Sequence, residues 1–360
     1  MAERGSRIDD PVVVVGGGPV GIRTAQELSR RGARVVLFNA ERWRPYNRVK
    51  LTPLLAGEAQ VGAIYLSDYF PKPGGVDRYD GASVVDIDRD AREVLTSTGR
   101  VVRYSKLVLA LGSRAHRPAL PGSTLEDVFV FRDMNDAEAL LARAFAARRV
   151  AVIGGGLLGL EAARGMARRG AEVTVIEHES RLMPRQLDDD AGAILKVRIE
   201  ALGTRVLTGV RVASIDGADR VQSVTLSDGE RVPADTVIVC AGVRANIQLP
   251  SAIGLDVGRG VMVDDRMRTS DLHIFAVGEC AEHDGVVHGL VGPGFEQALA
   301  AAEVIAGDGD IRYRGSTPAT KLKVLGADVF AMGDFESVEQ LPGVASHVWR
   351  DDEAGLYRRA

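Results

Sequence analysis

The segment Pro11–Gly21, PVVVVGGGPVG, constrains the fold of this 360-residue chain more than any other stretch. Four consecutive valines after a proline predict a strand that is buried on both faces, as in a parallel sheet. The glycines follow as Gly16-x-Gly18-x-x-Gly21, and Ile22–Arg31 continues with helical spacing. A glycine-rich turn between a strand and a helix is typical of a dinucleotide-binding loop, in which backbone N–H groups and the helix N-terminus bind a pyrophosphate.

The same pattern occurs a second time, at an offset of 138 residues. Val150–Glu161, VAVIGGGLLGLE, places Gly154-x-Gly156-x-x-Gly159 between a strand and a helix. The match extends beyond the glycines, because Leu28–Glu41 aligns with Met166–Glu179 at the same offset. We interpret this match as an internal duplication of a whole βαβ unit, which predicts two dinucleotide-binding domains.

The two copies differ at the end of their second strand, where a ribose is usually bound. The first copy has Asn39, with Glu41 two residues later, and the second has Glu177. A carboxylate accepts hydrogen bonds from both ribose hydroxyls, each worth ~1.5–3 kcal/mol, and repels a 2′-phosphate. Glu177 therefore predicts NADH rather than NADPH in the second domain. Basic residues close to it would favour a phosphate instead: His178, Arg181 and Arg185.

Composition and charge exclude several classes of function. The net charge is −4, and no stretch concentrates lysine and arginine, so we expect no nucleic-acid partner. No apolar run reaches the ~18–20 residues of a membrane helix, and the N-terminus does not resemble a signal peptide. Cys240 and Cys280 have no metal or disulfide spacing, and the six histidines have no ligand spacing. We expect a reduced, cytoplasmic protein without a bound metal.

Two further segments suggest cofactor contacts. Ile274–Val277 predicts a strand followed by Gly278-Glu279, a carboxylate placed to bind a polyol hydroxyl, and Gly292-Pro293-Gly294 opens a helix over 295–306. The segment Glu41–Leu55 is both aromatic and basic. It is either a solvated loop with anchoring rings or a segment that crosses a cofactor, with Arg48 toward phosphate and Lys50 near a redox-active ring.

The combination of these motifs resembles the FAD- and NAD(P)-dependent pyridine-nucleotide oxidoreductases. The closer resemblance is to the flavoprotein part of assimilatory NAD(P)H nitrite reductase large subunits and to rubredoxin-reductase-like proteins. The segments that carry it are Pro45–Arg48, Leu54–Glu58, Leu182–Asp188, Val277–His283 and Thr320–Val324. The resemblance implies an α/β fold with two Rossmann-like domains of the three-layer ββα type. An FAD domain would comprise 1–113 and 236–315, an inserted NAD(P)H domain 114–235, and a small, short α+β C-terminal domain 316–360.

The motifs and the resemblance together predict which residues bind the cofactors. Those assigned to FAD are Gly16, Gly18, Pro19, Gly21, Asn39, Glu41, Arg48, Lys50, Val85, Ala110, Gly112, Gly278, Glu279, Gly294 and Phe295. Those assigned to NADH are Gly154, Gly156, Leu158, Gly159, Glu177 and Gly242.

The chain departs from the family pattern beside the flavin. Relatives have a lysine paired with the glutamate that corresponds to Glu161, but Pro53 follows Thr52 at that place, so Lys50 would have to reach across. The usual Ala-Thr-Gly turn is Ala110-Leu111-Gly112, which lacks the threonine hydroxyl. The chain also lacks the CxxxxC of disulfide reductases and the iron–sulfur ligands of a nitrite-reducing domain.

The function that the resemblance implies is hydride transfer from NADH to N5 of FAD, followed by electron transfer to a partner redox protein or reductase subunit. Glu161 and Lys50 are the candidate catalytic residues, because they are the nearest ionisable groups. Two alternatives stay open: a flavoenzyme acting directly on a small molecule, and a non-catalytic flavoprotein subunit or redox sensor. A homodimer is possible.

Overall fold

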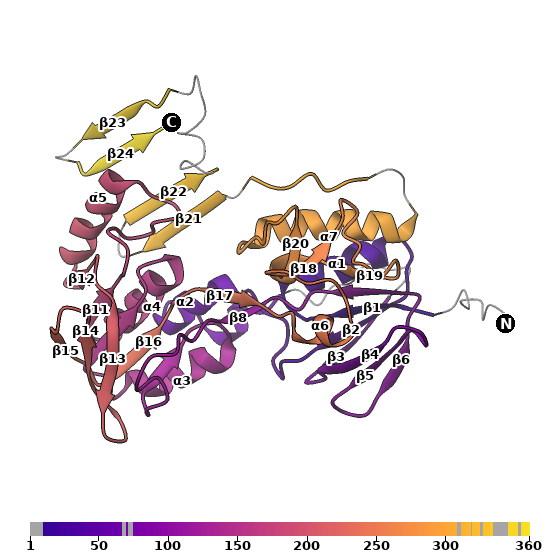
Figure 1. Ribbon diagram of the computed structural model, residues 1–360, viewed down its shortest axis with the longest axis horizontal. Helices are drawn as coiled ribbons and strands as arrows, with labels where there is room; N and C mark the ends of the chain where they lie inside the picture. The colour runs from indigo at the N-terminus through magenta and orange to yellow at the C-terminus, as the bar shows by residue number, and fades with distance from the viewer. Residues whose placement is uncertain are drawn as a thin grey trace. The chain divides into compact units, whose positions relative to one another are not determined.

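The computed structural model describes residues 10–66, 70, 75–307, 311–317, 319–324, 327–333, 345–351 and 354–360. They form two compact units (Figure 1). The first unit comprises Met1–Arg48, Ile64–Arg114 and Val243–Pro318, and the second comprises Val49–Ala63, Ala115–Gly242 and Ala319–Ala360.

The first unit is built on a five-stranded sheet in the order β19-β7-β1-β2-β3, in which all neighbours are parallel. Its strands are β1 (Val12–Val15), β2 (Val35–Asn39), β3 (Val76–Asp80), β7 (Lys106–Leu109) and β19 (Ile274–Ala276). Helices α1 (Pro19–Arg30) and α7 (Val291–Ala306) pack against each other and cover one face. An antiparallel sheet covers the other face, with strands β4 (Val84–Asp88), β5 (Glu93–Thr96) and β6 (Val101–Arg103).

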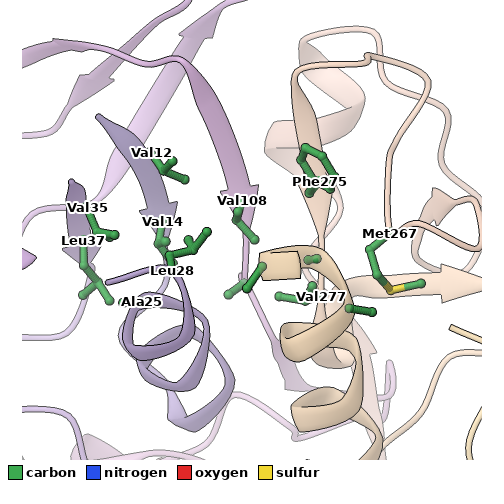
Figure 2. Packing of buried hydrophobic residues seen from close by; sticks show 14 of the residues in the cluster. Val12, Val14, Ala25, Leu28, Val35, Leu37, Val108, Met267, Phe275 and Val277 are labelled. Carbon is green, nitrogen blue, oxygen red and sulfur yellow. The ribbon is translucent and has the colours of Figure 1, made fainter. Parts of the chain in front are cut away.

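The four valines of β1 explain this layering. Successive side chains of a strand point to opposite faces. Val12 and Val14 join the core beneath α1, where Leu28 meets them (Figure 2). Val13 and Val15 join the core on the opposite face, beneath the antiparallel sheet. All four valines are at most 5% exposed, as predicted for a strand buried on both faces.

The second unit repeats the design. Its parallel sheet has the order β12-β11-β10-β16-β9. The strands are β9 (Val128–Val130), β10 (Arg149–Ile153), β11 (Glu172–Ile176), β12 (Arg205–Leu207) and β16 (Thr236–Val239). The antiparallel strands are β13 (Val212–Gly217), β14 (Val221–Leu226) and β15 (Arg231–Pro233). The helices are α2 (Leu51–Leu55), α3 (Met134–Ala144), α4 (Leu157–Arg168) and α5 (Asp189–Glu200).

Shorter elements complete the two units. They are η1 (Arg48–Lys50), η2 (Val61–Ala63), β8 (Ser113–Ala115), β17 (Val243–Ala245), α6 (Gln248–Ala252), β18 (Val261–Val263), η3 (Gly278–Cys280) and β20 (Ala281–His283). Two hairpins follow, β21 (Ala319–Val324) with β22 (Ala327–Met332), and β23 (Val348–Asp351) with β24 (Leu356–Arg359). The second hairpin is tied to α5, because Tyr357 and Arg359 both donate hydrogen bonds to its N-cap, Asp188.

The units differ from the predicted domain boundaries at three places. Residues 49–63 group with the second unit rather than with 1–48, because α2 packs on α4. Residues 236–242 also stay in the second unit, since β16 pairs with β10 and β9. The C-terminal hairpins, predicted as a small domain over 316–360, group with the second unit in their contacts.

The predicted fold class is confirmed: each unit is a Rossmann-like α/β arrangement of helices, a parallel sheet and an antiparallel sheet. The Asp228-Gly229 turn joins β14 to β15, and Gly229 has a φ of +90°. Across the described ranges, the helices are all too short or too polar to span a lipid bilayer.

Candidate dinucleotide-binding sites and a buried carboxyl group

The first glycine-rich turn leaves an open space at its second glycine. Gly16 has a φ of +124°, and a Cβ there would lie 2.1 Å from the carbonyl oxygen of Ala110. A Cβ on Gly21 would lie 1.9 Å from the oxygen of Gly16, so both glycines are required for backbone packing. Gly18 is the N-cap of α1, and a Cβ on it would meet nothing within 4 Å. Pro19 follows at the first helical position, where its missing N–H costs nothing.

The second turn has the same geometry. Gly154 has a φ of +115°, and a Cβ there would lie 2.4 Å from the oxygen of Cys240. A Cβ on Gly159 would lie 1.9 Å from the oxygen of Gly154. Gly156 caps α4 and, like Gly18, has open space around it. Each unit therefore presents a helix N-terminus behind a backbone-lined space that a side chain would fill, as a phosphate site requires.

The side chains at the ends of β2 and β11, Asn39 and Glu177, are both fixed by hydrogen bonds to neighbouring residues. The Asn39 amide donates to Trp43 O and to Asp80, and its oxygen accepts from Glu41 N. The Glu177 carboxylate accepts from Gly155 N at 2.6 Å and from Glu179 N at 2.9 Å. The first copy is thus neutral at this position, whereas the second carries a buried negative charge.

Arg48 and Glu41, which were both predicted to contact a cofactor, form an ion pair with each other. Arg48 Nη2 pairs with Glu41 Oε1, and the Tyr46 hydroxyl donates to Glu41 Oε2 at 2.7 Å. The Arg48 guanidinium also lies 5.6 Å from the centroid of the Tyr46 ring. The Glu41–Leu55 segment is thereby anchored rather than freely solvated at its start.

Glu279 is held by Ser113, which is not among the predicted site residues. The Ser113 hydroxyl donates to Glu279 Oε2 at 2.9 Å. Gly112 has a φ of +62°, and a Cβ there would lie 4.0 Å from the same carboxylate oxygen. Ala110 is buried at the end of β7. The ends of strands β7 and β19 therefore bring the Gly112 turn and Glu279 together.

Val20 of α1 fixes the start of α7. A Cβ on Gly294 would lie 2.6 Å from Val20 Cγ2, and one on Gly278 would lie 3.3 Å from the same side chain. Gly278 N donates to the buried Gln297 side chain at 2.7 Å. Phe295 is 37% exposed beside these contacts. The glycines predicted for cofactor binding thus have a packing role as well.

The remaining candidates lie on exposed or turn positions. Val85 is 51% exposed on β4, and Leu158 is partly buried in the first turn of α4. Gly242 is exposed with a φ of +91°, and its oxygen accepts from His116 N at 2.9 Å.

Glu161 has a partner that differs from the expected one. The Thr52 hydroxyl donates to Glu161 Oε2 at 3.1 Å. Lys50 is exposed and its Nζ donates to the carbonyl oxygen of Ala63 at 3.0 Å. Burial raises the pKa of the Glu161 carboxyl to about 7, although the hydrogen bond from Thr52 and the charge of Arg164 lower it. The carboxyl group therefore changes protonation state near neutral pH.

Residues 10–303 match the family model "Pyridine nucleotide-disulphide oxidoreductase". The chain belongs to the pyridine nucleotide-disulphide oxidoreductase family. Residues 318–360 match a second model, "Rubredoxin NAD+ reductase C-terminal domain". The family depends on FAD and a pyridine nucleotide.

Relatives within the family include electron-transfer proteins. The chain is 39% identical over 354 residues to the assimilatory nitrate reductase electron transfer subunit of Bacillus subtilis, covering 97% of this chain and 45% of that protein. It is 34% identical over 275 residues to rubredoxin-NAD(+) reductase of Pseudomonas putida, covering 75% and 71%. The chain spans less than half the length of the nitrate and nitrite reductase relatives that it matches.

A solved structure agrees over nearly the whole chain. The ferredoxin reductase for the CYP199A2 system from Rhodopseudomonas palustris superposes with a TM-score of 0.89 at 28% identity, covering 98% of this chain and 88% of that one. The family assignment therefore covers both units and the C-terminal hairpins.

The two glycine-rich turns fit the two dinucleotides on which the family depends. The open spaces at Gly18 and Gly156 admit a phosphate against the helix N-termini. The first unit has Glu279 and the Gly112 turn at the sheet edge, suited to a polyol, and the second has Glu177. These residues could hold FAD and a nicotinamide dinucleotide, respectively.

One group of potential metal ligands in the described part of the chain lies outside these turns. Single ligand atoms of Asp265, His283 and Asp284 lie within 4.8 Å of one another. His283 Nε2 already contacts Asp265 Oδ1 at 3.0 Å, and Arg312 lies 3.7 Å from the other oxygen of Asp265. A guanidinium at this distance favours an ion-pair cluster over a cation site.

Proposed function

We propose that this chain takes hydride from NADH onto FAD and passes the electrons to a partner redox protein or reductase subunit. The observation that carries the proposal is the pair of glycine-rich turns, one in each unit, whose second glycine faces open space. A single such turn would support only one nucleotide. Two of them, with different residues behind them, support a donor and an acceptor.

The first unit would bind FAD. Backbone N–H groups at Gly18 and the α1 N-terminus would bind the pyrophosphate, and Glu279 would accept a hydrogen bond from a ribityl hydroxyl. The Ser113 hydroxyl orients the Glu279 carboxylate for this role. When bound, FAD supplies the hydride-accepting ring and can release its two electrons singly.

The second unit would bind NADH in preference to NADPH. The Glu177 side chain is 5% exposed and already oriented by two backbone N–H groups. Its charge would repel a 2′-phosphate. The nearby Arg181 guanidinium donates to Leu187 O, Pro184 O and Asp189, so its donors serve its own loop.

Glu161 would be the ionisable group that responds to the hydride transfer. With a pKa raised to about 7, its carboxyl can give or take a proton at physiological pH. Lys50 would contribute less than the sequence suggested, because its ammonium is exposed and bonded to Ala63 O.

The test is an anaerobic titration of the purified, FAD-loaded protein with NADH and, separately, with NADPH. The proposal expects full loss of the oxidised-flavin absorbance with NADH and a higher kcat/KM for NADH. Flavin that binds but stays oxidised would instead indicate a non-catalytic flavoprotein. Turnover with a one-electron acceptor protein, but not with small two-electron acceptors, would support electron transfer to a partner.

A further inference from the structure

The contact between Thr52 and Glu161 joins two segments of the second unit that are far apart in the sequence. Thr52 lies in α2 and Glu161 in the first half of α4, and the bond from Thr52 Oγ1 to Glu161 Oε2 measures 3.1 Å. Thr52 is only 4% exposed, so water does not compete effectively for its hydroxyl. A hydroxyl buried at this depth needs a protein acceptor, and Glu161 provides it.

Three contacts hold α2 against α4. A Cβ on Gly165 would lie 2.7 Å from Leu55 Cγ, so the two helices approach closely at this glycine. Arg169 Nε donates to Leu55 O at 2.8 Å, and Arg164 pairs with Glu58 at 2.5 Å. These contacts fix the position of α2 relative to the Glu161 backbone.

The residues inside α2 favour the same geometry. Pro53 stands in the first turn of the helix, where a missing backbone N–H leaves no broken bond. Thr52 is β-branched, so its χ1 rotamers are restricted and its hydroxyl has few alternative directions. The proline that replaces the expected lysine thus belongs to a helix that presents a threonine hydroxyl to Glu161.

We propose that Thr52 is a positioning residue for Glu161: by donating to Oε2 it orients the carboxyl group and leaves Oε1 to carry the proton. This inference rests on the proposed function, in which Glu161 exchanges a proton during flavin reduction. A carboxyl oxygen that accepts a hydrogen bond from a hydroxyl is the unprotonated one, so the donated bond selects between the two oxygens. Thr52 then takes the place of the lysine as the partner of this glutamate.

Several charged and titratable groups act in the same region. Arg164 on α4 lowers the pKa of Glu161, in the same direction as the Thr52 bond. The Cys240 thiol at the end of β16 is neutral, because burial raises its pKa to about 12, with Asp136 on α3 and Glu161 adding to the effect. Burial also raises the pKa of Asp136, to about 6. Thr52 differs from these groups in acting through a direct hydrogen bond.

The test compares Thr52→Val with Thr52→Ser in the oxidised, FAD-bound protein. Infrared difference spectra recorded during a pH titration report the C=O band of the protonated Glu161 carboxyl, identified by its loss in Glu161→Gln. We expect Thr52→Val to raise the midpoint of this band by about one to two pH units, since a hydrogen bond to the carboxylate is lost. Thr52→Ser keeps a donor and should leave the midpoint at its wild-type value.

A matched control is Thr24→Val, which removes a buried helical hydroxyl that donates to Val20 O in the first unit. It should not shift the band. If Thr52→Val does not fold, Thr52→Ala removes the same hydroxyl without adding a methyl group. A midpoint that is unchanged in both, or shifted equally in Thr52→Ser, overturns the inference.

The pH profile of NADH-driven flavin reduction provides the second readout. The part of the pH profile that reflects titration of Glu161 should shift to higher pH in Thr52→Val, by the same amount as the infrared midpoint. If wild-type flavin is not reduced by NADH, the proposed function fails, but the infrared midpoints still decide whether Thr52 sets the state of Glu161. A slower reaction with an unshifted pH profile would mean that Thr52 is only structural.

Discussion

Alanine at the first and second glycines of the turn proposed to bind NADH, Gly154 and Gly156, should have opposite consequences. Gly154→Ala should destabilise the second unit with little direct effect on a ligand. Gly156→Ala should leave the fold intact and weaken NADH binding. The two positions are two residues apart in one turn, so each variant is the matched control for the other.

The magnitudes follow from the geometry. At a φ of +115°, alanine is strained by about 1–3 kcal/mol, and its Cβ would lie 2.4 Å from the oxygen of Cys240. Relieving that overlap costs about 1–3 kcal/mol more, so Gly154→Ala should lose roughly 2–6 kcal/mol. Gly156 has φ −77° and ψ −177°, which alanine adopts readily, and a Cβ there meets nothing within 4 Å. Gly156→Ala should therefore be neutral, or stabilising by about 0.4–1 kcal/mol.

For NADH binding we expect the opposite order, with a larger effect of Gly156→Ala than of Gly154→Ala. A Cβ at Gly156 fills the space in which a pyrophosphate would approach the backbone. Losing one hydrogen bond to a charged phosphate costs about 1.5–3 kcal/mol, which corresponds to a ten- to hundredfold higher Kd for NADH.

The assay combines thermal unfolding, the FAD content of the purified protein and an equilibrium titration with NADH. FAD content serves as the internal reference, because the glycine-rich turn proposed to bind FAD belongs to the first unit. The reasoning would be refuted if Gly156→Ala bound NADH like the wild type. It would also be refuted if Gly154→Ala unfolded at the wild-type temperature.

Three further predictions address single side chains. Glu177→Gln removes the buried charge and should move the kcat/KM ratio at least about tenfold toward NADPH, a change of ~1.4 kcal/mol, measured with both coenzymes. Glu161→Gln should change how stability depends on pH, because burial raises the folded-state pKa of this carboxyl from 4.5 to about 7. The stability that the neutral carboxyl contributes is complete below pH 4.5 and is lost as the pH rises through 7, so urea unfolding at pH 5 and pH 8 should show the wild type losing about 2–3 kcal/mol more than the variant. Tyr357→Phe removes the hydroxyl that donates to Asp188 and should lower the local stability of the last hairpin by about 1 kcal/mol, seen as faster hydrogen exchange in β24.

The parts of the fold that the sequence predicted are those with local signals. The four valines of β1 and the two glycine-rich turns each depend on residues within about a dozen positions of one another. Their geometry is set by sterics of the backbone and by the alternation of a strand, which a single sequence reveals.

No local sequence signal predicts where residues 49–63 pack. α2 is only five residues long, too short for a helical period to show, and its place depends on Leu55 meeting Gly165 across 110 residues of sequence. A glycine inside a predicted helix was the available hint, since it often marks a close approach. Without that contact, the sequence suggests only Lys50 as a hydrogen-bond partner for Glu161. It does not show that the hydroxyl of Thr52, next to Pro53, reaches this glutamate.

The duplicated units also show why the asymmetry at Asn39 and Glu177 is more than a difference in charge. A Cβ on Gly17 would lie 2.4 Å from Asn39 Cγ, and one on Gly155 would lie 2.9 Å from Glu177 Cβ, so both side chains fill the same space beside the turn. In the first unit, Asp80 Oδ1 accepts from the Asn39 amide at 3.0 Å. A carboxylate at position 39 would face Asp80 without that donor, and like charges at this distance repel. The first unit therefore has a carboxylate on the neighbouring strand, at Asp80 of β3, whereas the second has one at Glu177, directly after β11, where Gly155 N donates to it.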